Sequence, residues 1–289
     1  MSALSRAVQA GLDSRRIPPV TTAELPNRTT TTLNAWSHKP SPQGPPRMVV
    51  LGAGGQIGSV TGHCFKEENV VLTGFDLKDN NNPDIYESWH TGNTADLTAV
   101  RESLVDADYV LYLPTGSGAG WQAIVDAEIH GIKNVAQACV ESGVNRLMYA
   151  PSNHVTGMNE VEFHETGHLA KARPTSMPRP DGLYGSAKAF AEALLRSASE
   201  IHGLPVSVIR IGSMRAEDDP RAVADGPRFP GQTDDQYHQR MESVWLTHQD
   251  WKDTILREME AVDQFRLFYA SQDQTETPWT HEVYTWNPR

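Results

Sequence analysis

Residues 48–58 read Met-Val-Val-Leu-Gly-Ala-Gly-Gly-Gln-Ile-Gly, and this stretch decides the fold of the chain. Its four leading apolar residues predict a short strand that is buried on both faces. A turn with three glycines follows at once, and the sequence from Gln56 to about Phe65 is compatible with a helix. A strand, a tight glycine turn and a helix N-terminus form the unit with which doubly wound α/β sheets begin.

The same turn predicts an anion site, because backbone N–H groups and the positive end of the helix dipole face whatever binds there. Glycine is needed where a Cβ would block the approach of a pyrophosphate and of the helix to the strand. A second strand that ends in an acidic residue about 20 residues further on supports a dinucleotide site, and the segment 69–76 supplies one. We therefore predict a dinucleotide site formed by Gly52, Gly55, Gln56, Ile57, Gly58 and Asp76.

The acidic residue also predicts which dinucleotide binds. A carboxylate at the end of the second strand can accept hydrogen bonds from both ribose hydroxyls and repels a 2′-phosphate. We therefore expect Asp76 to favour NAD over NADP, with the nearby cation of Lys78 acting against that preference.

Composition narrows the class of protein. The chain has 289 residues, a net charge of −11 and no basic patch with interleaved aromatic residues, which argues against a nucleic-acid partner. No apolar run approaches the roughly 18 residues of a membrane span. Cys64 and Cys139 are predicted to be small buried side chains, and the eleven histidines form no cluster with cysteine, so we predict no metal site. A small-molecule substrate and a reducing compartment, the cytoplasm, fit these features.

Residues 1–47 differ from the rest of the chain. They hold seven prolines, a threonine run, and six of the 25 basic but only two of the 36 acidic residues. Such a segment buries too little apolar surface to offset its ordering entropy, so we predict a flexible extension. It has no apolar core of a secretory signal, and its arginines leave organelle targeting as a less favoured alternative.

From residue 48 onward, strand and helix patterns alternate. The predicted strands cover 48–51, 70–75, part of 90–96, 109–113, 146–150, 206–211 and 265–270. The predicted helices cover 56–65, 97–105 with Thr98 as N-cap, 121–142, 183–202 and 249–261, whereas 212–250 is predicted to be irregular. This alternation predicts a Rossmann-type, doubly wound parallel sheet. We expect one domain over 48–289, with a small discontinuous substrate-binding lobe from 153–182 and 212–289.

Ligands of such sheets bind beyond the carboxyl ends of the strands. Ser152 follows the strand 146–150, and Tyr184 and Lys188 share one face of the helix 183–202 because they are four residues apart. A phenol with a pKa of about 10 is a poor base at neutral pH, but a neighbouring ammonium stabilises the phenolate. With the serine hydroxyl holding the substrate oxygen, the three side chains form a general-base site. By itself, a Tyr-x-x-x-Lys spacing would indicate only a surface pair.

These motifs, taken in order, resemble the extended short-chain dehydrogenase/reductase superfamily over about 48–289. The resemblance implies that Ser152, Tyr184 and Lys188 are the catalytic set and that the last two also contact NAD. It further implies that the pair Asp96-Leu97 binds the cofactor, with the carboxylate on the adenine amino group.

A narrower resemblance is to uronate dehydrogenases. It rests on Ala150-Pro-Ser-Asn-His154, Arg179-Pro-Asp-Gly-Leu-Tyr-Gly-Ser-Ala-Lys188, Arg210-Ile-Gly-Ser213 and Trp245-Leu-Thr-His-Gln-Asp250. These enzymes oxidise the C1 hydroxyl of galacturonate or glucuronate to an aldarolactone with NAD. The resemblance implies substrate contacts by Ser117, Ser152, Asn153, His154 and Ser213, and a carboxylate contact by Arg221. Pro151 and the segment 113–117 depart from the pattern, and the chain ends early relative to these enzymes, so the sugar and any homo-oligomer are left open.

Two alternatives remain at this point. A nucleotide-sugar epimerase or dehydratase would retain NAD through purification and needs room for a nucleoside diphosphate. A non-catalytic, NAD-responsive binding protein would usually have lost Tyr184 or Lys188.

Purely structural roles are an alternative at several single positions. Arg221 can pair with Glu217, Asp218 or Asp219, and His154 can be structural. Structural roles are expected for Arg210, Trp245 and Trp251, and a solvated helix face for Glu258 and Glu260.

Overall fold

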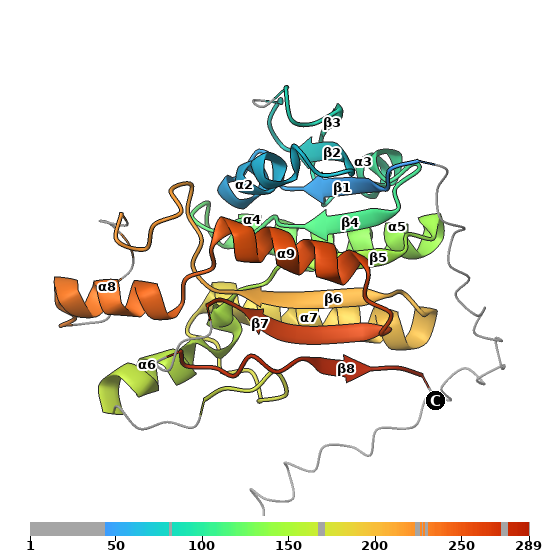
Figure 1. Cartoon of the computed structure of the whole chain (residues 1–289). Helices are drawn as coiled ribbons and strands as arrows, with labels where there is room; N and C mark the ends of the chain where they lie inside the picture. Colours follow the sequence, from blue (N-terminus) through green and yellow to red (C-terminus); the bar gives the residue numbers. More distant parts are fainter. Residues whose placement is uncertain are drawn as a thin grey trace, which may run out of the picture. The chain divides into compact units, whose positions relative to one another are not determined.

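The computed structural model describes residues 44–80, 83–166, 171–222, 226, 228, 231–272 and 277–288. The centre of the fold is an eight-stranded sheet with the order β3-β2-β1-β4-β5-β6-β7-β8, in which only β8 runs antiparallel to its neighbour (Figure 1). The strands are β1 Arg47–Leu51, β2 Val71–Asp76, β3 Ser88–Thr91, β4 Tyr109–Tyr112, β5 Arg146–Tyr149, β6 Val206–Ile211, β7 Phe265–Ala270 and β8 Tyr284–Trp286. The order reverses between β1 and β4, which is the topological switch point of the sheet.

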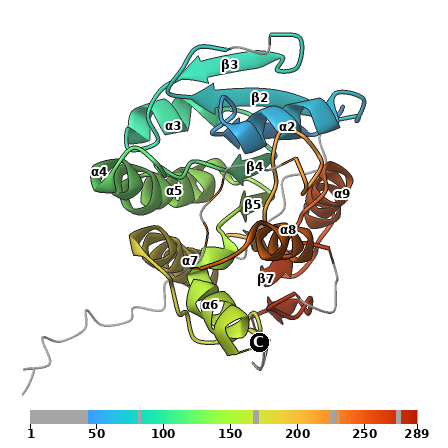
Figure 2. The ribbon, with the colours of Figure 1, turned by 90° about the vertical axis from the view of Figure 1, so that its left-hand side faces the viewer.

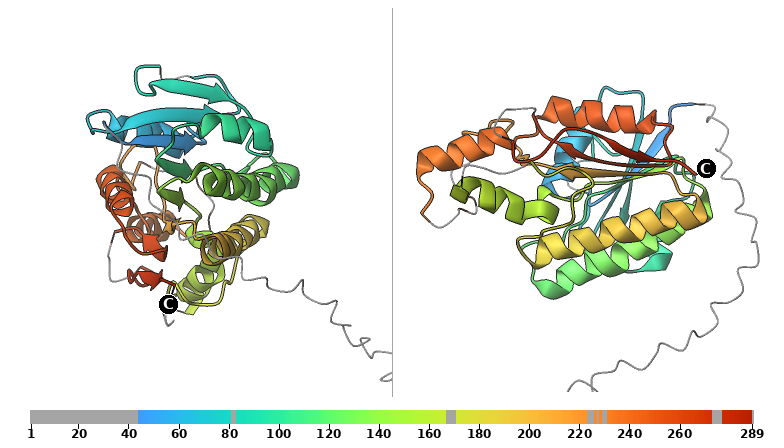
Figure 3. Two further views of the ribbon diagram at one scale, coloured as in Figure 1. Left: turned by 90° about the vertical axis from the view of Figure 1, so that its right-hand side faces the viewer. Right: turned by 90° about the horizontal axis from the view of Figure 1, so that it is seen from below.

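Helices cover both faces of the sheet, as seen end-on in Figure 2. On one face lie α2 (Gln56–Phe65) and α9 (His248–Met259), which contact each other. On the other face lie α3 (Leu97–Ser103), α4 (Trp121–Val125), α5 (Ile132–Ser142) and α7 (Leu183–His202). Two further helices, α6 (Gly157–Thr166) and α8 (Asp234–Ser243), extend past the carboxyl ends of the strands (Figure 3). These two helices frame the edge where ligands of such sheets bind.

The apolar run of β1 divides its side chains between the two faces. Met48 and Val50 join the core under α2 and α9, and Val49 and Leu51 join the core under α3, α5 and α7. All four side chains are at most 2% exposed. Each of these buried side chains stabilises the fold by about 1.5–3 kcal/mol, which explains why this run forms a central strand.

Buried ion pairs tie the layers together and correct one prediction. Glu258 on α9 is fully buried and accepts hydrogen bonds from Arg266 at 2.7 and 3.1 Å and from Ser207 at 2.7 Å. The predicted solvated position of Glu258 is therefore wrong, because this face of α9 packs on β7 and meets its arginine. Arg210 has the predicted structural role and pairs with Glu192 at 2.7 Å.

The secondary structure differs from the predictions in a few places. The N-cap of α3 is Asp96 and not Thr98, because the Asp96 carboxylate accepts hydrogen bonds from the N–H groups of the next residues. The predicted helix 121–142 contains a π-helical segment, Asp126–Gly131. No strand or helix was predicted for α6, α8 or β8.

The predicted substrate lobe lies only partly beyond the sheet. Within 212–289, β7 and β8 belong to the sheet and α9 covers it, so α8 and the adjoining loops are the part near the ligand edge. The predicted extension, 1–47, lies outside the described residues up to position 43, and Arg47 opens β1.

Candidate active site

The glycine turn after β1 requires glycine at two positions for different reasons. Gly52 has a φ of +85°, a conformation that costs L-residues with a Cβ. A Cβ on Gly58 would lie 2.3 Å from the Gly52 carbonyl oxygen, so only glycine lets α2 begin this close to the strand. The turn therefore has the close helix–strand packing that the sequence predicted.

A cavity of about 640 Å³ opens beside this turn, at the carboxyl ends of β1, β2 and β4. Asp76 lies on its wall, where its carboxylate accepts hydrogen bonds from the N–H of Gly54 at 3.0 Å and of Lys78 at 3.2 Å. Each carboxylate oxygen keeps a free lone pair, which suits a diol such as a ribose. The glycine turn, the helix N-terminus and this carboxylate fit NAD. All the turn residues predicted to bind it line the cavity, namely Gly52, Gly55, Gln56, Ile57 and Gly58.

The predicted contacts of Asp96 and Leu97 with the cofactor find less support. Neither residue lines the cavity, and Asp96 uses its carboxylate to cap α3 at 2.9 Å from the N–H of Thr98. The cavity wall in this region is formed instead by Asn93 and Thr94.

Beside this cavity lies a smaller one of about 240 Å³. The two cavities share Ile57, Ser117 and Arg215, so they adjoin. The smaller one is lined by most of the predicted catalytic and substrate residues, namely Ser117, Ser152, Asn153, His154, Tyr184 and Ser213. Residues spread over about 100 positions of the chain thus converge on one volume next to the cofactor cavity.

Tyr184 stands at the start of α7, one turn before Lys188. Its ring centroid lies 5.5 Å from the Lys188 Nζ and 5.9 Å from the His154 ring. Close packing here depends on Gly185, since a Cβ on it would lie 2.2 Å from the His154 carbonyl oxygen. The glycine in Leu-Tyr-Gly-Ser-Ala-Lys therefore lets α7 bring the phenol against the loop after β5.

That loop holds Ser152, which lines the same cavity as Tyr184, in a fixed arrangement. Ser152 caps a short 3₁₀ helix, Asn153–Thr156, by accepting a hydrogen bond from the N–H of His154 at 3.3 Å. Its hydroxyl donates to the Asn153 side chain at 3.1 Å. The His154 Nδ1 lies 2.5 Å from a carboxylate oxygen of Asp181, which orients the imidazole.

Lys188 lies beside Tyr184, but its predicted contact with the cofactor finds less support. Its side chain is fully buried and lines neither cavity, although its Nζ lies 3.5 Å from the carbonyl oxygen of Pro114, a residue of the large cavity. The Nζ lies 2.5 Å from the buried carboxylate of Glu128, a residue that the sequence reasoning did not single out. Only the side-chain spacing of the helix 121–142 could have indicated it, and the π-helical segment shifts that spacing.

The structure does not bring Arg221 to the smaller cavity. Its side chain is 75% exposed and its Nε donates to Glu242 at 2.6 Å. Two other arginines line the cavity instead, Arg215, whose Nη1 donates to the Met214 carbonyl at 2.9 Å, and Arg240. Arg240 lies on α8 and contacts the buried carboxylate of Glu160 at 2.5 Å. The signal that could have revealed α8 is the capping box formed by Thr233 and Gln236.

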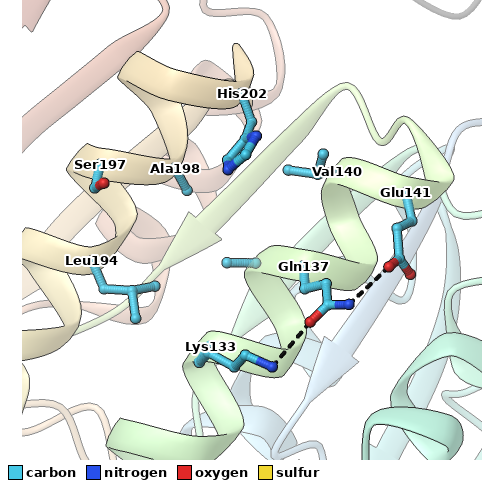
Figure 4. Close-up of a pocket in the computed structure, with 9 residues that line it drawn as sticks. Lys133, Gln137, Val140, Glu141, Leu194, Ser197, Ala198 and His202 are labelled. Atoms are coloured by element: carbon cyan, nitrogen blue, oxygen red, sulfur yellow. Dashed lines mark hydrogen bonds between the residues drawn. The ribbon is translucent and has the colours of Figure 1, made fainter. Parts of the chain in front are cut away.

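A third cavity, of about 450 Å³, lies between α5 and α7 and shares no lining residue with the other two. Figure 4 shows Lys133, Gln137 and Glu141 of α5 joined in a row of hydrogen bonds, across from Leu194 and His202 of α7. This third cavity is therefore not part of the candidate active site.

Metal-binding clusters and membrane-spanning helices are both absent from the part of the chain that the structure describes. Among the described side chains, which do not include those of His38, His164 and His168, no group of three or more His, Cys, Asp or Glu is placed to hold a metal ion. Among the same residues, no helix has the length and apolar character needed to cross a membrane.

The chain is similar to known proteins in sequence and in fold. The sequence profile of the NAD dependent epimerase/dehydratase family matches residues 48–271. The chain is 26% identical over 237 residues to the NAD-dependent glucose-6-phosphate dehydrogenase of Haloferax volcanii, covering 78% of this chain and 85% of that protein. It is 28% identical over 210 residues to the uronate dehydrogenase of Agrobacterium fabrum, covering 72% and 70%. A crystal structure of a mutant uronate dehydrogenase from Agrobacterium tumefaciens complexed with NAD superposes with a TM-score of 0.64 at 23% identity, covering 82% of this chain and 80% of that one.

Proposed function

The chain belongs to the NAD dependent epimerase/dehydratase family, and from this premise we propose that it oxidises the C1 hydroxyl of a hexuronic acid, galacturonate or glucuronate, to the aldarolactone. The observation that carries the proposal is the position of Tyr184 and Ser152 on a small polar cavity that adjoins the cofactor cavity. Two relatives, a sugar-phosphate dehydrogenase and a uronate dehydrogenase, act on small anionic sugars, which supports this class of substrate.

In the proposed reaction, each side chain has one task. The Tyr184 phenolate takes the proton of the C1 hydroxyl. The Ser152 hydroxyl turns its one proton from the Asn153 side chain to the same oxygen and holds that oxygen in place. The Lys188 ammonium, 5.5 Å from the phenol ring, favours the phenolate by its charge. NAD, when bound, would accept the hydride that C1 loses. Asp76 and the glycine turn would hold it at the adjoining cavity.

The size of the smaller cavity favours a single sugar over a nucleotide sugar. At about 240 Å³ it falls below the roughly 300–1,000 Å³ range of pockets that enclose drug-sized ligands. A monosaccharide needs less room than a nucleoside diphosphate sugar, so this volume counts against the epimerase alternative.

The substrate carboxylate needs a local cation, since the chain carries a net charge of −11. Arg215 is suited to this task because it lines both cavities and forms no ion pair with a carboxylate among the described residues. Arg240 is already paired with Glu160, and Arg221 with Glu242. We therefore assign the carboxylate contact, which the resemblance implied for Arg221, to Arg215. A guanidinium can meet a carboxylate with two parallel hydrogen bonds.

The test is a substrate panel measured on the wild type and on a matched pair of variants. Galacturonate, glucuronate, glucose 6-phosphate and neutral aldoses are each assayed with NAD by the appearance of NADH. We expect the uronates to have the highest kcat/KM. Arg215→Ala should lower kcat/KM for uronates roughly 10- to 150-fold, the equivalent of losing a charge-assisted contact of about 1.5–3 kcal/mol. Arg221→Ala serves as the control and should leave it nearly unchanged.

The outcomes separate the parts of the proposal. A preference for glucose 6-phosphate would refute the hexuronate assignment. Equal losses on charged and neutral sugars in Arg215→Ala would show that Arg215 supports the loop only. A larger loss in Arg221→Ala than in Arg215→Ala would restore the implied role of Arg221.

A further inference from the structure

A fully buried carboxylate, that of Glu128, lies behind the candidate active site. It is 0% exposed, as is Lys188, and one of its oxygens lies 2.5 Å from the Lys188 Nζ. The other oxygen accepts a hydrogen bond from the Tyr149 hydroxyl at 2.7 Å. Burying a charge is costly unless it is paired, so a buried carboxylate needs a reason to be there. The reaction described above gives the carboxylate of Glu128 no task.

The helix that carries Glu128 is shaped to place it there. Glu128 belongs to the π-helical segment Asp126–Gly131, an interruption that is rare and often lies at functional sites. The segment is anchored by the Tyr112 hydroxyl, which donates to the Ala127 carbonyl at 2.6 Å. Gly131 lets β4 approach the π-helical segment, since a Cβ on Gly131 would lie 2.6 Å from the Tyr112 hydroxyl oxygen. The π-helical segment contacts α7 and directs Glu128 toward it.

The surroundings of Lys188 and Glu128 contain few other charges. Tyr112 and Tyr149 face Glu128 from β4 and β5, and Tyr184 and Glu192 act on Lys188 from its own helix. Burial by itself lowers the pKa of the Lys188 ammonium, but the carboxylate of Glu128 leads the contributions that hold that pKa above its usual value. Glu192 has a partner of its own, Arg210.

We infer that Glu128 is a positioning residue for the proposed reaction, one that keeps Lys188 charged and fixed beside Tyr184. The inference rests on the proposed roles of those two residues. Without a carboxylate partner, an ammonium in a site that excludes water loses its proton more easily. A neutral amine would no longer favour the phenolate, so the enzyme would reach full activity only at higher pH.

The variant Glu128→Gln tests this, because it keeps the size of the side chain and removes the charge. We expect the acid limb of the pH profile of kcat/KM to move to higher pH. At neutral pH, kcat/KM should fall about tenfold for every pH unit by which the limb moves, and activity should approach the wild type at alkaline pH. Glu128→Asp keeps the carboxylate and should retain the wild-type midpoint with a lower kcat, which also guards against a Gln variant that does not fold.

The control is Glu258→Gln, which removes an equally buried carboxylate on α9 that contacts neither catalytic side chain. It should lower stability and leave the midpoint of the profile in place. If Glu128→Gln lowers kcat/KM equally at every pH, or moves the midpoint downward, the inference is wrong and Glu128 only stabilises the fold.

A second measurement does not depend on turnover. The ultraviolet absorbance of the phenolate is titrated in the wild type and in Glu128→Gln, each corrected with the matching Tyr184→Phe variant. The midpoint of the phenolate titration should move to higher pH in Glu128→Gln. A rise without turnover on any sugar would leave the inference standing and refute the proposed function. Normal turnover with an unchanged midpoint would refute the inference alone.

Discussion

Asp76 provides the sharpest prediction about the cofactor. Its carboxylate is fixed at the end of β2 by the N–H groups of Gly54 and Lys78, at 3.0 and 3.2 Å, and it lines the large cavity. In Asp76→Asn the amide nitrogen can accept no hydrogen bond and the negative charge is lost. Losing one charge-assisted contact to a ribose hydroxyl costs about 1.5–3 kcal/mol, so kcat/KM with NAD should fall roughly 10- to 150-fold.

The same change should help NADP, because the carboxylate no longer repels a 2′-phosphate. The ratio of kcat/KM for NAD to that for NADP should therefore fall by at least about tenfold, measured by steady-state kinetics at saturating sugar. The control is Asp79→Asn, which removes a negative charge three positions further along the chain. Asp79 accepts a hydrogen bond from Thr91 and does not line the cavity. An unchanged ratio in Asp76→Asn, or an equal change in Asp79→Asn, would refute the role given to Asp76.

Two further predictions concern catalysis and stability. Tyr184→Phe removes only the phenolic oxygen, so kcat should fall by about 10² or more while the Kd for NAD, followed by quenching of tryptophan fluorescence, stays close to that of the wild type; near-normal turnover would exclude Tyr184 as the base. Glu258→Gln removes the buried carboxylate that pairs with Arg266 and leaves this guanidinium paired with Asp263. The free energy of unfolding in urea should therefore fall by about 1.5–3 kcal/mol, the value of a hydrogen bond to a charged group, and a loss below about 1 kcal/mol would show that the pair contributes little.

Much of the fold was predictable because buried parallel strands and amphipathic helices leave strong patterns. The bounds of α7, β6 and β7 match the predicted ranges, and α2 begins and ends where expected. The strand β8 was missed because it is short and lies at an edge, with side chains that are only partly buried. The helix α8 was missed because its residues are mostly polar, and only its capping box marks it.

Residues of the site were predictable where one strand end or one helix face places them. The glycine turn, Asp76 and Tyr184 follow local rules of spacing, and they line the adjoining cavities. The pairing of Lys188 with Glu128 was not predictable, because it depends on a π-helical segment that changes which side of a helix faces α7.

The same limit applies to the arginines. Arg215 and Arg221 lie in one irregular stretch with similar local sequence character, so no periodic pattern decides which of them faces the cavity. Their places follow from contacts with distant residues, such as the ion pair of Arg221 with Glu242 on α8. Long-range contacts of this kind leave no signal in the spacing of nearby residues.

The central claim is that a hydride leaves C1 of a sugar acid for NAD while Tyr184 takes the hydroxyl proton. Galacturonate and glucuronate labelled with deuterium at C1 test it most directly, with the reduced cofactor analysed by mass spectrometry. We predict that the deuterium appears in the reduced cofactor, that an aldarolactone is the product, and that Tyr184→Phe suppresses the transfer. Reduced cofactor without deuterium, or no reduction with any uronate while NAD binds normally, would contradict the account.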